Sequence, residues 1–192
     1  MRPSDVLAAA ELGADYVGFI LSEGFRRTVS LATFCELESI LRGNNVKKVG
    51  VFVNEPIEVI VKNYAGKLDL IQLHGSEDAD YIKTLRQYTD KPIIKAFKIA
   101  SEEDVKRACE STADYVLLDS GTGTGKTFDH SLICGIDRPF FLAGGLTAEN
   151  VEESIEKLHP FAVDASSCLE TEGKKDKNKM AAFVNAVRLA DR

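Results

Sequence analysis

The sequence lacks long hydrophobic runs and an excess of positive charge, and each absence excludes a class of protein. No stretch of the 192 residues reaches the roughly 18 consecutive apolar residues of a membrane-spanning helix, so we expect no membrane partner. The formal net charge of −6 disfavours a nucleic-acid partner. A local positive pocket for an acidic metabolite remains compatible with that charge.

Paired cysteines are also missing. Cys35, Cys109, Cys134 and Cys168 form no Cys-x-x-Cys motif and no other metal-ligand spacing, so we expect no metal site. Cys35 and Cys109 are predicted to fill helix faces. We expect the cysteines to stay reduced, and since no secretory leader is recognisable, we predict a cytoplasmic protein.

Short apolar segments alternate with amphipathic ones along the whole chain, which predicts a parallel sheet covered by helices. The composition, 44% hydrophobic and 28% charged, is ordinary for a globular protein, and the length fits a single domain over residues 1–192. The predicted strands are Tyr16–Leu21, Lys48–Val53, Leu68–Leu73, Pro92–Phe97, Tyr115–Leu118, Phe140–Ala143 and Phe161–Ala165. The predicted helices are Asp5–Leu12, Ala32–Leu41, Ile57–Tyr64, Ala79–Tyr88, Glu102–Glu110 capped by Ser101, a short stretch near Asp129–Ile133, one capped by Thr147, and Asp176–Leu189. The basic run Lys174–Lys179 is predicted to be a solvated loop and helix start.

Polar or glycine residues follow most of these strands at their carboxyl ends. A doubly wound sheet is the default for about seven strands, but this pattern favours a (β/α)8 barrel, whose functional groups lie at those ends. Such a barrel needs one more strand, which would precede Asp5. The residues concerned are Ser22, Asn54, His74, Lys98, Asp119, Gly144 and Ser166.

The segment FFLAGGLTAEN (Phe140–Asn150) combines a buried strand, two glycines and a helix start. Gly144 and Gly145 permit close backbone approach, and bare amide groups near a helix start attract phosphate. Ser166 and Ser167 follow the next predicted strand and supply hydroxyl donors. Phosphate sites of (β/α)8 barrels lie after strands seven and eight, so we predict a phosphate site here, with a plain tight turn as the alternative.

Three further positions carry candidate chemistry. Asp119 ends the apolar strand YVLLD, where lost solvation tends to raise a carboxyl pKa and suits a general acid; the alternative is a loop cap. Arg26 and Arg27 offer a bidentate fork for a carboxylate or phosphate, or are simply solvated. His74 ends the strand LIQLH and is a candidate substrate-binding residue, or a histidine that supports one.

The stretch GTGTGKT (Gly121–Thr127) suggests a nucleotide-binding P-loop, because it follows a strand and ends in Gly-Lys-Thr. However, the position of the first required glycine is occupied by Ser120. The helical stretch behind it is short and interrupted by Gly135. We therefore treat nucleotide binding as the weaker interpretation.

Taken together, these motifs resemble the phosphoribosylanthranilate isomerase family. The resemblance covers nearly the whole chain in family order, and its motifs are highly specific in combination. The matching segments are ELGADYVGFIL (Glu11–Leu21), FRRTVS (Phe25–Ser30), VGVFVNE (Val49–Glu55), IQLHG (Ile71–Gly75), IIKAF (Ile93–Phe97), LLD with GTGKTFD (Leu117–Asp129), LAGGLTAENV (Leu142–Val151) and HPFAVDASS (His159–Ser167).

The resemblance implies a (β/α)8 barrel enzyme of tryptophan biosynthesis, an aromatic amino acid pathway. It implies an Amadori rearrangement of N-(5′-phosphoribosyl)anthranilate, a small phosphorylated substrate, without metal or organic cofactor. A general acid protonates the furanose ring oxygen, the ring opens to an imine, and a general base removes the C2′ proton. By position, Asp119 matches the general acid.

The resemblance also implies the residues that bind the substrate. Arg27 matches the arginine that holds the anthranilate carboxylate, and Asp164 matches an aspartate close to the substrate. The phosphate cradle matches Gly144, Gly145, Ser166 and Ser167.

Two departures from the family pattern matter. The family's general base is a cysteine in a first strand ending K-I-C-G, a motif that residues 1–192 do not contain. Cys168 stands where the family usually has glycine.

We expect seven strands with an open edge on the strands at Tyr16 and Phe161, and such an edge invites self-association. We also expect little isomerase activity from residues 1–192 alone. The alternatives are a catalytically impaired relative that binds a phosphorylated ligand and a different phosphate-binding barrel enzyme.

Overall fold

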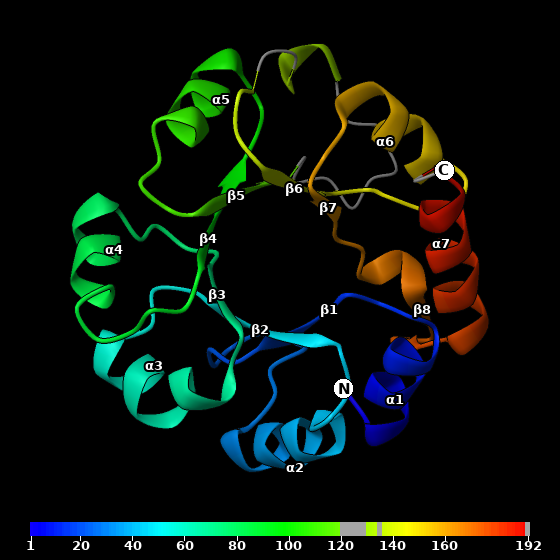
Figure 1. The fold of residues 1–192 in the computed structure, drawn as a ribbon, viewed down its shortest axis with the longest axis horizontal. Coiled ribbons are helices and arrows are strands. Elements are labelled where there is room, and N and C mark those ends of the chain that lie inside the picture. Colours follow the sequence, from blue (N-terminus) through cyan, green and yellow to red (C-terminus); the bar gives the residue numbers. More distant parts are fainter. Residues whose placement is uncertain (120–129, 134–135, 191–192) are drawn as a thin grey trace. The chain divides into compact units, whose positions relative to one another are not determined.

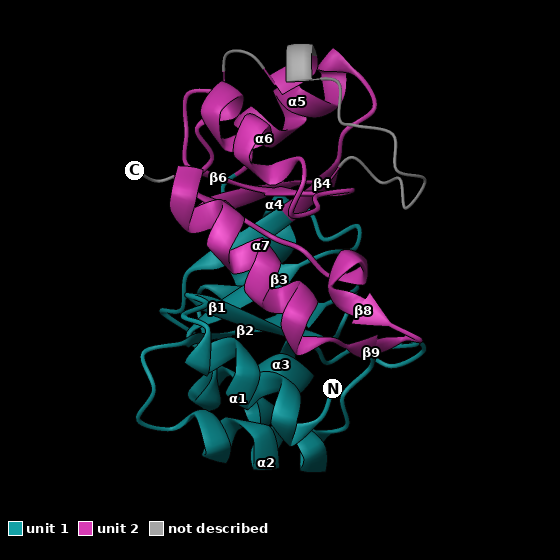
Figure 2. Ribbon diagram, turned by 90° about the vertical axis from the view of Figure 1, so that its right-hand side faces the viewer, with its two compact units in different colours: residues 1–95, 112–114 teal, residues 96–111, 115–192 magenta. Residues whose placement is uncertain are grey.

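The computed structural model describes residues 1–119, 130–133 and 136–190 of the chain. Within them, parallel strands alternate with helices, and the chain divides into two compact units (Figure 2). Unit 1 comprises residues 1–95 and 112–114, and unit 2 comprises residues 96–111 and 115–192. The parallel strands pair in the order in which they follow one another along the chain. The GTGTGKT stretch and Cys134 lie outside the described residues.

Unit 1 holds parallel strands whose helices lie on one side of them (Figure 1). Phe19 and Phe52 are fully buried on the face of β1 and β2 that packs against the helices, as the apolar pattern predicts. Phe34 and Tyr64 from the helical side pack edge-on or tilted against them. The elements are α1 (Pro3–Glu11), β1 (Tyr16–Ile20), α2 (Leu31–Leu41), β2 (Lys47–Phe52), α3 (Ile57–Asn63), η1 (Ala65–Lys67), β3 (Leu70–Leu73), α4 (Ala79–Leu85) and the start of β4 (Ile93–Lys98).

Unit 2 has a core of its own, formed between its strands and the helices beside them. Leu118, Leu142 and Val151 are fully buried there, and Phe183 of the last helix packs into the same cluster. The elements are α5 (Glu102–Cys109), β5 (Tyr115–Asp119), η2 (His130–Ile133), β6 (Phe140–Ala143), α6 (Val151–Leu158), β7 (Ala162–Val163), η3 (Ser167–Leu169), β8 (Glu170–Thr171), β9 (Lys174–Lys175) and α7 (Lys177–Ala190).

Most predicted elements are present, and the predicted cap of α5 is confirmed because Ser101 accepts a hydrogen bond from the Asp104 amide. The predicted strand Phe161–Ala165 is longer than the observed one, since β7 spans Ala162–Val163. The prediction for Cys109 was wrong: its side chain is exposed, because one residue along a helix turns it about 100° away from the buried Ala108. Among the described residues, no helix is long and apolar enough to span a membrane.

Near the candidate phosphate site, one local prediction was wrong and a second was confirmed only in part. Thr147 does not cap α6, which begins at Val151, because the Asn150 side chain accepts the Thr147 amide at 2.8 Å and closes a separate turn first. The helix start predicted in the run Lys174–Lys179 is confirmed, because α7 begins at Lys177. The predicted loop is wrong for Lys174–Lys175, which forms one strand of an antiparallel hairpin with β8.

Candidate functional site

Strand register in unit 2 brings three of the predicted residues to one edge of the sheet. Asp119, the last residue of β5, pairs with Ala143 of β6, and Gly144 follows directly. On the other side of β6, Leu142 pairs with Val163, so Asp164 stands level with Ala143. Neighbouring strands lie about 4.8 Å apart, so these groups share the carboxyl edge within about two strand spacings.

The backbone of the Gly144–Gly145 turn has a conformation that residues with a side chain rarely adopt. Both glycines have positive φ, 92° and 66°, which explains why the sequence has glycine at each position. Asn150 fixes the turn: its amide nitrogen donates to the Gly145 carbonyl at 3.0 Å, while its oxygen accepts from Thr147. Asn150 is a functional candidate that we did not single out from the sequence, although it lies in the quoted GGLTAEN motif.

Ser166 and Ser167 follow the Asp164 edge position by two and three residues. The short helix η3 begins at Ser167, and such a helix after the last strand accompanies the phosphate sites of (β/α)8 barrels. Cys168 is part of that helix, half-buried, and packs against the core of unit 2. Burial raises the pKa of its thiol, with Lys175 opposing the shift, so the thiol is neutral at neutral pH.

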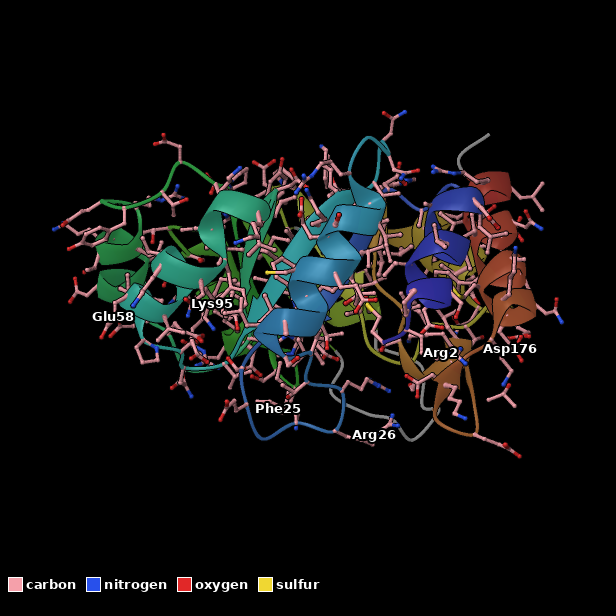
Figure 3. All side chains as sticks on the ribbon, turned by 90° about the horizontal axis from the view of Figure 1, so that it is seen from below. Arg2, Phe25, Arg26, Glu58, Lys95 and Asp176 are labelled. Atoms are coloured by element: carbon pink, nitrogen blue, oxygen red, sulfur yellow. The ribbon has the colours of Figure 1, made fainter. Side chains whose placement is uncertain are left out.

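In unit 1, Phe25 and Arg26 lie on a loop after β1 (Figure 3), and hydrogen bonds hold the base of this loop. Ser22 is 2% exposed, donates its hydroxyl to Glu55 at 2.7 Å and accepts from the Val53 amide at 3.0 Å. Thr28 donates to the Ser22 carbonyl at 2.8 Å, which closes the loop. Arg26 is exposed, whereas the neighbouring Arg27 is partly buried.

His74 stands at the carboxyl end of β3, where the sequence predicted it. Its amide donates to the Phe52 carbonyl at 2.7 Å, and its side chain is exposed. The Nδ1 atom of His74 lies 2.9 Å from the side-chain Nε2 atom of buried Gln72. If Gln72 donates this bond, Nδ1 is the acceptor and the neutral ring keeps its proton on Nε2.

A buried ion pair supports the loop after His74. The side chains of Lys95 and Glu77 are 7% and 1% exposed and meet at 3.1 Å. Lys95 also donates to the carbonyls of Leu73 and Gly75, at 3.3 and 2.7 Å. Glu77 accepts the amides of Asn54 and Gly75 as well, at 2.6 and 2.9 Å. We did not identify this pair from the sequence.

The backbone of Gly75, in the same loop, leaves no room for a side chain. A Cβ atom there would stand 2.5 Å from the Asn54 side-chain oxygen, closer than real contacts allow. The same Asn54 oxygen accepts from the amide and the hydroxyl of Ser76. The glycine of the LHG sequence is therefore required by the close approach of Asn54.

The predicted residues thus fall into two groups, each of which is described within its own unit. Asp119, Gly144, Gly145, Asp164, Ser166 and Ser167 lie in unit 2, and Arg27 and His74 lie in unit 1. Within the described ranges, no three histidine, cysteine or acidic side chains gather as a metal site would require. The expectation of metal-free and cofactor-free chemistry stays a prediction.

Comparison with known proteins gives a consistent result over almost the entire chain. Residues 1–186 match the family model described as N-(5'phosphoribosyl)anthranilate (PRA) isomerase. The N-(5'-phosphoribosyl)anthranilate isomerase of Caldanaerobacter subterraneus subsp. tengcongensis is 41% identical, over 97% of this chain and 94% of that protein. The protein of the same name from Streptococcus mutans is 40% identical, over 95% and 92%.

Solved structures agree with the sequence relatives. The phosphoribosyl anthranilate isomerase of Thermotoga maritima superposes with a TM-score of 0.87 at 35% identity, covering 98% of this chain and 95% of that one. Another such isomerase, in complex with reduced 1-(o-carboxyphenylamino)-1-deoxyribulose 5-phosphate, gives a TM-score of 0.84 at 35% identity, covering 97% and 94%. The predicted fold class is confirmed by these similarities.

Proposed function

The chain belongs to the N-(5'-phosphoribosyl)anthranilate isomerase family, and we propose that it converts N-(5′-phosphoribosyl)anthranilate to 1-(2-carboxyphenylamino)-1-deoxyribulose 5-phosphate in tryptophan biosynthesis. The observation that carries this proposal is the common edge of Asp119, Gly144 and Asp164 in unit 2. This edge places the carboxyl group of Asp119 beside a glycine turn that suits a phosphate. Acid-catalysed ring opening of a phosphorylated sugar requires both groups in one place.

In this proposal Asp119 is the general acid. Its carboxyl group gives a proton to the furanose ring oxygen as the C1′–O bond breaks, and the lone pair of the anthranilate nitrogen forms the double bond to C1′, which gives an N-protonated imine. A base then takes the C2′ proton, and the resulting enol ketonises to the product. The family resemblance assigns that base to a cysteine in a K-I-C-G motif, so Asp119 supplies one of two required groups.

The remaining residues bind the substrate. Gly144, Gly145, Ser166 and Ser167 hold the phosphate through backbone amides and hydroxyls, which are favourable donors to an anion. The guanidinium of Arg27 binds the anthranilate carboxylate in a bidentate manner. Asp164 and His74 contact the substrate from the strand ends at which they stand.

Fluorescence of the substrate provides the test, because the signal is lost as phosphoribosylanthranilate is consumed. The assay is run on residues 1–192 and on the same chain preceded by a strand ending in K-I-C-G. Turnover that rises strongly with the added strand supports the proposal and the cysteine base. Binding of the reduced product analogue with no turnover in either form identifies a catalytically impaired relative instead.

We predict that Gly145→Val weakens phosphate binding far more than it weakens the fold. Valine at a φ of 66° costs about 1–3 kcal/mol of strain, and its side chain fills space that the anion needs. Titration calorimetry with inorganic phosphate measures the affinity, and urea unfolding measures the stability. Gly43→Val is the matched control, because Gly43 has a φ of 86° and no heavy atom near an added Cβ. Equal phosphate affinity in the two variants would contradict the assignment.

In the form preceded by a strand ending in K-I-C-G, we also predict that Arg27→Ala raises the KM for the substrate about tenfold to hundredfold, the range expected for losing a charged bidentate contact. Arg26→Ala removes the same charge from an exposed neighbour and should leave KM nearly unchanged. Inorganic phosphate should bind both variants like the parent chain, since the contact is to the carboxylate. If Arg26→Ala is the more damaging change, the wrong arginine has been assigned.

A further inference from the structure

The hairpin that follows η3 is small and well defined. Strands β8 and β9 pair antiparallel, with Glu170 opposite Lys175 and Thr171 opposite Lys174. Their connection is the two-residue loop Glu172-Gly173, with φ values of 51° and 75°. Positive φ at both positions is the turn geometry that matches the twist of paired strands. The hairpin thereby fixes where Lys175 stands relative to the residues before it.

The ammonium group of Lys175 is directed back to the serine turn. It donates to the Ser166 carbonyl at 2.7 Å, and it lies 3.3 Å from both the Ser166 hydroxyl and a Glu170 carboxylate oxygen. Its side chain is 17% exposed. By contrast, the preceding Lys174 is exposed. The Ser166 carbonyl also accepts from the Leu169 amide at 3.2 Å, so Lys175 and the short helix η3 hold the same carbonyl.

We propose that Lys175 is a positioning residue for phosphate binding, acting through the Ser166–Ser167 turn; this rests on the phosphate site proposed above. The Ser166 carbonyl and the Ser167 amide belong to one peptide group, and the described chain contains no cis bond. In a trans peptide these two groups point in opposite directions. A carbonyl held by Lys175, together with the Leu169 amide, therefore directs the Ser167 N–H away from both, as a donor for an anion.

The same contact orients the serine hydroxyl. Because an ammonium group has only donors, the Ser166 oxygen accepts from Lys175 and its own hydrogen is directed elsewhere. A phosphate, which has only acceptors when fully ionised, suits such a hydroxyl. Both serine donors are thus set before the ligand arrives, and pre-organisation of this kind increases affinity.

A weaker phosphate affinity after replacement of Lys175 could also result from the lost positive charge and not from the lost orientation of the turn. Its partner Glu170 has a side chain only 9% exposed, so removing the lysine leaves a carboxylate near the turn that would repel phosphate. The variant Lys175→Met/Glu170→Gln removes both charges and leaves the turn without its ammonium donor. Orientation predicts weak binding in this double variant, whereas repulsion predicts recovery.

The test measures the Kd for inorganic phosphate by titration calorimetry on the full chain, with melting followed by circular dichroism. We expect Lys175→Met and the double variant to raise Kd about tenfold, while Lys175→Arg, which keeps a cationic donor, stays within about threefold. Lys174→Met is the matched control, because it removes the same charge one residue away, and it should bind like the parent. If Lys175→Met does not fold, the comparison of Lys175→Arg with Lys175→Gln replaces it.

Each outcome decides between the accounts. Weak binding in both Lys175→Met and the double variant, with Lys174→Met unaffected, supports the positioning role. Full recovery in the double variant, or an equal loss in Lys174→Met, overturns it in favour of charge. If Gly145→Val weakens phosphate binding and Lys175→Met does not, the inference fails while the phosphate site stands. A parent chain that binds no phosphate overturns the site and this inference together.

Discussion

Asp119→Asn is expected to lower kcat by about 10²–10⁴-fold, the usual contribution of a general acid. Asparagine has nearly the same shape, but its amide cannot transfer a proton to the ring oxygen. The backbone of Asp119 should be unaffected, because its carbonyl accepts from the Ile99 amide at 2.9 Å whatever the side chain. The fluorescence assay measures this in a form of the chain that turns the substrate over.

Asp164→Asn is the matched control for that experiment. It makes the same replacement at the same edge of unit 2, at the position that follows β7. A residue that contacts the substrate without giving it a proton should affect KM more than kcat. An Asp119→Asn variant that keeps its kcat would exclude Asp119 as the acid. An Asp164→Asn variant whose kcat falls further than that of Asp119→Asn would assign the acid to Asp164.

The part of this site that sequence reasoning predicted depends on strand ends. β6 has the bounds expected for it, and Asp119 ends β5, because apolar runs broken by polar residues are strong local signals. Parallel pairing then places such ends at a common edge, which the register in unit 2 confirms. The single domain, the cytoplasmic location and self-association through edge strands stay predictions.

The part that sequence reasoning missed consists of contacts between segments. Asn150 replaced Thr147 as the residue that organises the turn before α6, since its side chain accepts from the Thr147 amide, whereas the Thr147 hydroxyl accepts from the nearby Glu149 amide. Lys175 appeared to belong to a solvated basic run, and nothing local indicated that a hairpin would fold it onto Ser166. Lys95 stands in the apolar segment IIKAF, and its partner Glu77 is 18 residues away.

That buried pair gives the largest stability effect we expect. Lys95→Met should lower the free energy of unfolding by about 3–5 kcal/mol, because it leaves Glu77, 1% exposed, as a buried carboxylate without its cation. The amides of Asn54 and Gly75 still donate to Glu77, so the loop keeps part of its support. These two hydrogen bonds do not replace the charge of the lost ammonium group. Urea unfolding followed by circular dichroism measures the difference.

Lys98→Met supplies the control within the same strand, since Lys98 is the exposed last residue of β4 and should change stability by no more than about 0.5 kcal/mol. Glu77→Gln separates charge from hydrogen bonding: glutamine can accept from the amides but removes the anion, so Lys95 becomes the uncompensated group. We expect this variant to be destabilised as well, because lysine is then a buried cation with carbonyl partners alone. If Lys95→Met costs no more than Lys98→Met, the loop that carries His74 is held by its backbone contacts, and the ion pair contributes nothing to it.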